Sequence, residues 1–148
     1  MKCLTICQPY ASLIVLPDDD ERAKRVENRT WPTDHRGPLL IHAGKSRRWL
    51  VGDNYGIPLD DMPFGFIVGI CELRGCVPKH PMSGNPHGFG DATINRWPWL
   101  AFHRHAEGPF CWVLAECRKF AEPIPYRGMQ GLFEVPKHLI ERNLSQCP

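Results

Sequence analysis

The segment from Lys24 to Trp31 brings together side chains that can recognise a negatively charged ligand. If residues 26–31 form a strand, Glu27, Arg29 and Trp31 share one face, because side chains alternate along a strand. Glu27 can then pair with Arg29 and orient its guanidinium toward a phosphate or a base. Trp31 can offer a surface on which a base stacks. The alternative is a surface salt bridge beside a core tryptophan, and the residues alone leave both interpretations open.

Lys24 has two chemical interpretations, catalysis and binding. A lysine that is desolvated in a cleft loses its charge more readily and can serve as a base or nucleophile. A carboxylate nearby, such as that of Glu27, instead favours the charged ammonium. A phosphate contact is the simpler role for Lys24, so the chemistry favours binding over catalysis without excluding hydrolysis.

Positive charge is concentrated in residues 22–48, although the whole chain carries a formal net charge of only +2. This segment holds eight lysine and arginine residues against two carboxylates, Glu27 and Asp34. Such local asymmetry predicts an anionic partner or, equally, a solvated basic face. Lys45 and Arg47 follow an apolar segment and open a predicted helix, where they can contact backbone phosphates or simply face solvent.

The remaining polar and aromatic candidates have structural interpretations that compete with functional ones. His42 lies in an apolar run and is more often a core histidine with its hydrogen bonds satisfied. The pair Trp97 and Trp99 can stack on bases, but we favour a lid that folds over the core. The seven cysteines include no CxxC pair and are expected to be reduced, so we assign no metal site and no cofactor.

The segments that must position these residues are mostly short strands. Strands are expected at Lys2 to Ile6, Val26 to Trp31 and Leu39 to Ala43, and a bent strand at Phe64 to Val77 follows from its three glycines. A helix begins at Gln8-Pro9 and ends at Pro17. Ser46 is expected to cap a further helix through Leu50.

The second half of the chain has a long irregular stretch between strands. Residues 78–109 are rich in Pro, Gly, His and Asn and are predicted to be a surface insertion or lid, with a helical turn near Asp91 to Arg96. A strand follows at Phe110 to Phe120, then a separate extended piece around Pro123 and Pro125. A last strand, Leu132 to Val135, leads into a helix that starts at Pro136.

This pattern predicts an α+β fold, a small mixed β-barrel of about six strands with three or four short flanking helices. The 148 residues suit a single domain. No apolar run is long enough to cross a bilayer, and the N-terminal segment lacks the features of a secretory signal. We therefore expect a cytoplasmic protein without a membrane partner.

Several segments in order resemble the ASCH (activating signal cointegrator homology) domain family of the PUA-like superfamily. The run from Leu4 to Ile14 is similar to the opening strand and Gln-Pro-aromatic-Ala helix start of that family. Lys24, Glu27 and Arg29 match its signature GxKxxExR, although Arg22 stands where the family has glycine. The runs 36–43, 64–69 and 125–133 resemble its later strands, so the resemblance covers the chain apart from residues 78–109.

The resemblance implies a PUA-like barrel with a cleft for RNA beside the signature. Lys24, Glu27 and Arg29 would line it, with Gln8 and Tyr10 at the helix start. Some small bacterial members are amidohydrolases that remove an acyl group from N4-acetylcytidine. Their lysine falls on Lys24, their threonine falls on Glu27, and a strand glutamate is matched by Glu72.

Three functions follow as hypotheses, and the first is favoured. The chain is predicted to bind RNA, a nucleotide or a nucleoside in a basic cleft, using eight residues, namely Gln8, Tyr10, Lys24, Glu27, Arg29, Trp31, Lys45 and Arg47. The alternative is an enzyme, an amidohydrolase of acylated cytidine or a ribonuclease, with Lys24, Glu27 and Glu72 as catalytic residues. A third hypothesis is a cleft for an acidic peptide. The residues leave open whether the protein is an enzyme.

Overall fold

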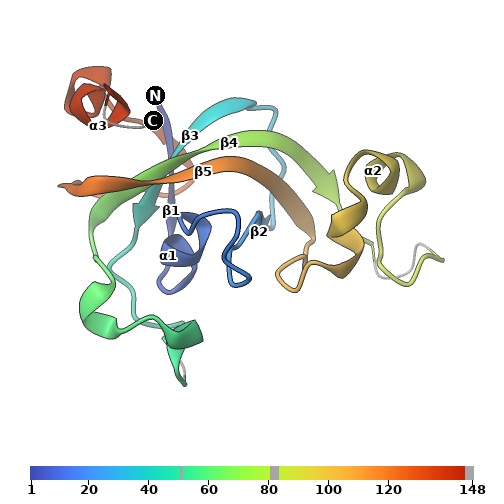
Figure 1. Cartoon of the computed structure of the whole chain (residues 1–148). Helices are drawn as coiled ribbons and strands as arrows, with labels where there is room; N and C mark the ends of the chain where they lie inside the picture. Colours follow the sequence, from blue (N-terminus) through green and yellow to red (C-terminus); the bar gives the residue numbers. More distant parts are fainter. Residues whose placement is uncertain (51, 81–83, 146–148) are drawn as a thin grey trace. The chain divides into compact units, whose positions relative to one another are not determined.

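The computed structural model describes residues 1–50, 52–80 and 84–145 and has an α+β fold (Figure 1). Within these residues the strands are β1 (Lys2–Ile6), β2 (Val26–Arg29), β3 (Gly37–Ala43), β4 (Phe66–Pro78), β5 (Phe110–Pro125) and β6 (Leu132–Glu134). The helices are α1 (Tyr10–Ile14), α2 (Asp91–Arg96) and α3 (Glu141–Ser145). The expected class, six strands with three short helices, is confirmed.

The six strands form one mixed sheet in the order β2-β5-β4-β3-β1-β6. β1 pairs parallel with β3 and antiparallel with β6. β2 pairs antiparallel with β5, so that Glu27 lies opposite Trp112 and Arg29 opposite Phe110. A single sheet with both parallel and antiparallel pairs and no regular βα alternation is the mixed architecture that the sequence predicts.

The chain divides into two compact units, each built from separate stretches of sequence. The first unit contains residues 1–24, 38–72 and 116–148, and the second contains residues 25–37 and 73–115. β4 and β5 contribute residues to both units because their ranges cross these limits. Each candidate residue can therefore be described within its own unit.

The first unit has a core in which strands and the C-terminal helical segment meet. Eight buried side chains form it, namely Cys3, Leu40, Ile67, Ile70, Phe120, Phe133, Val135 and Ile140. β1 lies between β3 and β6, and its register places Cys3 beside both Leu40 and Phe133. The same register places Thr5 beside His42. These two polar side chains therefore lie on adjacent strands of the first unit.

The second unit has its own core, to which the irregular stretch contributes directly. Its buried side chains are Val26, Val77, Phe89, Leu100, Ala106, Cys111 and Val113. Phe89 and Leu100 belong to residues 78–109, so this stretch is more than the surface insertion that the sequence predicted; residues 81–83 lie outside the described part. Its helical turn is confirmed as α2. Gly75 is needed here because a Cβ would lie 2.5 Å from the Trp97 ring.

Two predictions for the basic segment are wrong in extent or type. β2 ends at Arg29 rather than at Trp31. The helix expected after Ser46 is a single turn, with the Leu50 N–H donating to the Arg47 carbonyl. The Ser46 hydroxyl accepts the Arg48 N–H two residues later, as a capping serine does, but only this one turn follows it.

Boundaries also differ near the C-terminus. β5 runs without interruption from Phe110 to Pro125, so the extended piece around Pro123 is part of the same strand. Glu116 has a φ of 51°, a local irregularity within the long strand. The expected terminal helix from Pro136 is divided into a 3-10 turn at Lys137–Leu139 and α3. Pro125 is tolerated in β5 because it is the last residue of the strand.

Candidate functional site

The signature residues of β2 form an ion pair within the second unit. The Arg29 Nη2 lies 3.1 Å from the Glu27 Oε1, and both side chains are mostly shielded from solvent. The predicted pairing is therefore confirmed. A guanidinium held in this way has a fixed orientation.

Trp31 lies beyond the end of β2, so the strand from which the shared face of Glu27, Arg29 and Trp31 was predicted does not extend to it. Its ring meets the buried Trp112 ring edge to face, with centroids 4.8 Å apart at 89°. The Trp112 indole N–H also donates to the Trp31 carbonyl over 3.4 Å. These contacts give Trp31 a packing role, while base stacking by this residue stays a prediction.

Asn28, between the two paired residues, has a role that sequence reasoning missed. Its amide nitrogen donates to the His105 carbonyl over 2.8 Å. Its Oδ1 accepts the backbone N–H groups of Glu107 and Gly108 over 3.0 and 2.9 Å. Asparagine is disfavoured in strands, which is the one signal that could have indicated a specific hydrogen-bonding role. Asn28 thus ties residues 105–108 to β2.

Lys24 is almost completely buried in the first unit, with 3% of its surface exposed. Its Nζ lies 5.7 Å from the centroid of the Tyr10 ring, a cation–π distance. Tyr10, the first residue of α1, also makes edge contacts with Trp49 and Tyr55 at 6.4 and 6.3 Å. Two predicted site residues, Lys24 and Tyr10, are therefore brought together by α1 and the segment that follows it.

Gln8 is fully buried and acts through its side-chain amide on the local backbone. Its Nε2 donates to the Pro63 carbonyl over 2.9 Å, and its Oε1 accepts the Ser12 N–H over 3.1 Å. These bonds fix the start of α1 against residues 59–63. Gln8 thereby supports the position of Tyr10, and a direct ligand contact by Gln8 stays a prediction.

The acidic segment before Lys24 neutralises Arg22, which stands in place of the family glycine. The Arg22 Nε and Nη2 donate to the two carboxylate oxygens of Asp20 over 2.9 and 2.6 Å. Its Nη1 donates to the Tyr55 carbonyl over 3.1 Å. The carboxylate raises the pKa of Arg22, the hydrogen bonds being the main cause. Arg22 therefore links Asp20 to the Tyr55 backbone. Its charge, one of the eight positive charges of residues 22–48, is balanced by that of Asp20.

Two arginines of the first unit lie against aromatic rings at the surface. The Arg47 guanidinium lies 4.7 Å from the centroid of Phe64, and that of Arg48 lies 5.2 Å from the centroid of Trp49. Trp49 is 46% exposed. We name Arg47, Arg48, Trp49 and Phe64 the basic aromatic surface. It presents oriented donors for phosphate next to a ring on which a base can stack.

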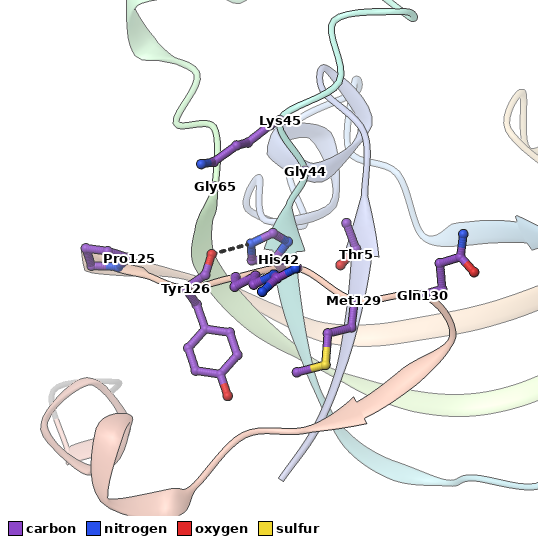
Figure 2. Close-up of a pocket in the computed structure, with 11 residues that line it drawn as sticks. Thr5, His42, Gly44, Lys45, Gly65, Pro125, Tyr126, Met129 and Gln130 are labelled. Carbon is purple, nitrogen blue, oxygen red and sulfur yellow. Dashed lines mark hydrogen bonds between the residues drawn. The ribbon is translucent and has the colours of Figure 1, made fainter.

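A pocket of about 830 Å³ opens in the same unit, between the ends of β1 and β3 and the segment that links β5 to β6 (Figure 2). Its volume is within the range of small-molecule sites. Lys45 is the predicted site residue that lines it, together with Thr5, His42, Gly44, Gly65, Pro125, Tyr126, Arg127, Gly128, Met129 and Gln130. Sequence reasoning assigned no functional residue to this linking segment.

His42 lines the pocket although only 1% of its surface is exposed. Its Nε2 lies 3.0 Å from the Tyr126 carbonyl, and its Nδ1 is buried without a hydrogen-bond partner (Figure 2). Burial lowers the pKa of His42, and the charge of Lys45 acts in the same direction. The expectation of a core histidine with satisfied hydrogen bonds is therefore wrong for one of its two nitrogens.

Two glycines at the walls of the pocket allow close packing that a Cβ would prevent. A Cβ on Gly128 would lie 2.6 Å from the His42 Cε1 and 2.8 Å from the Thr5 Oγ1. A Cβ on Gly65, whose φ is 82°, would lie 2.8 Å from the Lys45 Cε. Both glycines belong to runs that carry the family resemblance, and the geometry provides the physical reason for them.

The other predicted residues are not joined in one site. Lys24 belongs to the first unit, and Glu27, Arg29 and Trp31 belong to the second, so their sharing of one groove stays a prediction. Glu72 is half-buried on β4, between the buried Cys71 and Leu73. No contact joins it to Lys24 among the interactions of the described residues, and its catalytic role also stays a prediction.

Metal binding and thiol chemistry have no support in the described part of the chain. Across residues 1–50, 52–80 and 84–145, no three His, Cys, Asp or Glu side chains gather closely enough to hold one ion. Burial raises the pKa of Cys3 to about 12, which makes that thiol unreactive. In the same residues, no helix has the length and apolar character that crossing a bilayer requires.

The sequence is similar to known proteins across most of its length. The model of the ASCH domain family matches residues 4–124. Activating signal cointegrator 1 of Homo sapiens is 35% identical over 146 residues, covering 90% of this chain, and its Mus musculus counterpart is 36% identical over 88 residues, covering 51%. The chain spans only 22% and 14% of the length of these two relatives.

Solved structures show the same fold at low sequence identity. The crystal structure of ASCH from Zymomonas mobilis has a TM-score of 0.54 at 15% identity, covering 98% of this chain and 94% of that chain. A mutant form of the same protein has a TM-score of 0.53 at 17% identity, covering 98% of this chain and 96% of that chain. At these identities the likeness concerns the fold alone.

Proposed function

Because the chain belongs to the ASCH domain family, whose members in general are PUA-like RNA-binding modules, we propose that it binds RNA through the basic aromatic surface of its first unit. The observation that carries this proposal is the pair of guanidinium groups held against rings, Arg47 on Phe64 and Arg48 on Trp49. A protein that needed these arginines only for solubility would gain nothing from orienting them.

The chemistry of this surface suits a single strand of nucleic acid. Arginine contributes charge and a planar fork that meets phosphate with two hydrogen bonds. An exposed indole such as that of Trp49 accepts any base, with a stacking contribution of about 1–3 kcal/mol per base. Lys45, one turn earlier and also exposed, adds a third cation. Backbone charge combined with stacking supports binding that tolerates many sequences.

The test is a salt titration of binding to a single-stranded RNA oligomer of mixed sequence. Affinity should fall linearly with salt on logarithmic axes, because cations release counterions from the phosphates. The double variant Arg47→Ala/Arg48→Ala should bind at least about tenfold more weakly at low salt, and its salt slope should be smaller by about two. The matched control is Arg36→Ala, since Arg36 is an exposed arginine of the same basic segment that bonds only nearby carbonyls.

Two outcomes would contradict the proposal. One is unchanged affinity in the double variant, which would remove the basic aromatic surface from the interaction. The other is equal binding of a peptide of acidic residues at matched charge, which would favour the acidic-peptide hypothesis. Bases stack on Trp49 and glutamate side chains do not, so RNA should bind more tightly if the proposal is correct.

A second candidate function, hydrolysis of an acylated cytidine, is favoured by one observation. Lys24 is 3% exposed and lies against Tyr10, a shielded setting of the kind that a lysine base or nucleophile requires. Incubation with N4-acetylcytidine, followed by chromatography, tests for deacetylation. Turnover that persists in Lys24→Ala would exclude this role for Lys24, and no turnover in the unaltered protein would leave binding as the function.

A further inference from the structure

The pocket of the first unit contains one buried acceptor that the protein leaves unsatisfied. The Tyr126 carbonyl can only accept, so the proton of the neutral His42 ring resides on Nε2. Nδ1 then carries no proton and can only accept a hydrogen bond. It has no hydrogen-bond partner although it is buried. Buried polar atoms are nearly always paired, so an unpaired one at a pocket wall indicates a ligand that supplies the donor.

A glycine packs closely against this acceptor, and no larger residue fits at its position without a shift. Gly128 has ordinary backbone angles, yet a Cβ there would lie 2.6–2.8 Å from the His42 ring and from the Thr5 hydroxyl oxygen. The register of β1 and β3 places Thr5 and His42 side by side, and Figure 2 shows both reaching toward the linking segment. A hydroxyl and a bare ring nitrogen side by side match a flat ligand edge that carries adjacent donor and acceptor atoms.

The segment that covers the acceptor is free of regular structure. Residues 126–129 lie between β5 and β6 and belong to neither strand. Arg127 and Met129 are exposed, while the Tyr126 ring stacks on Phe133 with an interplanar angle of 12°. The segment is therefore anchored at Tyr126, and Gly128 takes part in no strand pairing.

The mouth of the pocket is positively charged. Lys45 and Arg127 line it from opposite segments, and both are exposed. Gly65 allows the Lys45 side chain to lie along the wall, because a Cβ there would meet its Cε at 2.8 Å. Two cations would attract an anionic group of a ligand. The Thr5 hydroxyl and His42 Nδ1 would form hydrogen bonds with a flat heterocycle at its other end.

We propose that this pocket takes one nucleoside monophosphate unit, with the base edge against His42 Nδ1 and Thr5 and the phosphate between Lys45 and Arg127. The inference rests on the proposed RNA binding and adds the recognition of a single base beside the basic aromatic surface. The unit can be part of an RNA strand or a free nucleotide, because both present the same base and phosphate.

The first experiment measures binding of the four ribonucleoside 5′-monophosphates to the full chain by calorimetry, with ribose 5-phosphate as the probe that lacks a base. At least one nucleotide should bind about tenfold or more tightly than ribose 5-phosphate. An analogue of that nucleotide whose base N–H is replaced by N-methyl should lose about tenfold. Equal binding of ribose 5-phosphate and all four nucleotides would overturn the proposal, since it would show phosphate recognition alone.

The second experiment adds a methyl group at Gly128, next to the His42 ring and the Thr5 hydroxyl. Gly128→Ala should weaken the preferred nucleotide at least about tenfold and leave ribose 5-phosphate within about twofold. Gly90→Ala is the matched control, because a Cβ at Gly90 meets nothing within 4 Å. Thr5→Val, which keeps the shape of the side chain, should give a smaller loss of the same kind and provides an independent measurement if Gly128→Ala fails to fold.

The experiments distinguish a failure of the RNA-binding proposal from a failure of the pocket proposal. If RNA binding depends on Arg47 and Arg48 but neither nucleotides nor Gly128→Ala show the expected effects, the pocket proposal is wrong and the RNA proposal stands. If nucleotides bind and the RNA oligomer does not, RNA binding is wrong and the pocket serves a free nucleotide. An RNA oligomer that competes with the nucleotide for the pocket would identify the strand as its source.

Discussion

The two units of this protein use their polar side chains in opposite ways. In the second unit the polar residues of β2 are used internally, since Glu27 pairs with Arg29 and Asn28 bonds three backbone groups of residues 105–108. In the first unit Arg47 and Arg48 lie on rings at the surface, and His42 keeps one buried acceptor unsatisfied. This difference is why we propose binding by the first unit, while these contacts of β2 organise the second.

The largest expected effect tests whether the irregular stretch is a true core. Phe89→Ala removes a fully buried ring from the second unit and should lower the free energy of unfolding by about 3–5 kcal/mol. The matched control is Phe102→Ala, because Phe102 is 90% exposed in the same stretch and should change stability by less than about 0.5 kcal/mol. Chemical denaturation measures both. Similar losses in the two variants would show that residues 84–109 form no core.

A smaller effect is expected from the internal hydrogen bonds of β2. Asn28→Ala leaves the N–H groups of Glu107 and Gly108 and the carbonyl of His105 without this partner, which should cost about 1–3 kcal/mol. Asn28→Asp keeps the acceptor for the two N–H groups and removes only the donor, so it should cost less. Thermal unfolding ranks the variants. A greater loss in Asn28→Asp than in Asn28→Ala would contradict the hydrogen-bond assignment.

The smallest effect concerns the pH dependence of the first unit. Burial and the Lys45 charge hold the pKa of His42 below its usual 6.5, although the bond to the Tyr126 carbonyl opposes them. Below pH 6.5 the unfolded chain therefore binds a proton at this residue that the folded chain does not, and stability rises with pH across that window. Above pH 6.5 the His42 contribution is flat.

The variant His42→Gln should remove this part of the pH dependence. Its loss of stability between pH 7 and pH 5 should be smaller than that of the unaltered protein, measured by denaturation at each pH. The matched control is His35→Gln, which replaces a histidine of the second unit in the same way. A steeper acid loss in His42→Gln would mean that His42 is not a neutral buried group.

The alternation of apolar residues sufficed to predict the strands near Lys2, Leu39 and Phe110. Local patterns failed where contacts distant in sequence decided the outcome. Ser46 makes the bond of a helix cap to the Arg48 N–H, but a single turn follows it in place of a helix, and Arg47 lies on the Phe64 ring. Residues 78–109 look polar and irregular, yet the few apolar ones, among them Phe89, meet in a core with β2 and β5 residues.

The site was predicted in its residue types and only partly in its arrangement. The pairing of Glu27 with Arg29 follows from the period of a strand, whereas Lys45 was predicted to contact phosphates and lines a pocket that was not predicted. The role of His42 could not be predicted, because whether each of its nitrogens finds a partner depends on a segment more than eighty residues later.

By itself, the amino-acid sequence determined the family, the α+β class, the local strands and the concentration of positive charge in residues 22–48. Each of these depends on residue type and on spacing along the chain. Only the tertiary structure decided which of those cations lie against an aromatic ring at the surface and which are paired with a carboxylate. It also decided that Gly128 packs against His42 and Thr5. The reason is that pairing and burial are properties of neighbours in space, and those neighbours come from strands far apart in the chain.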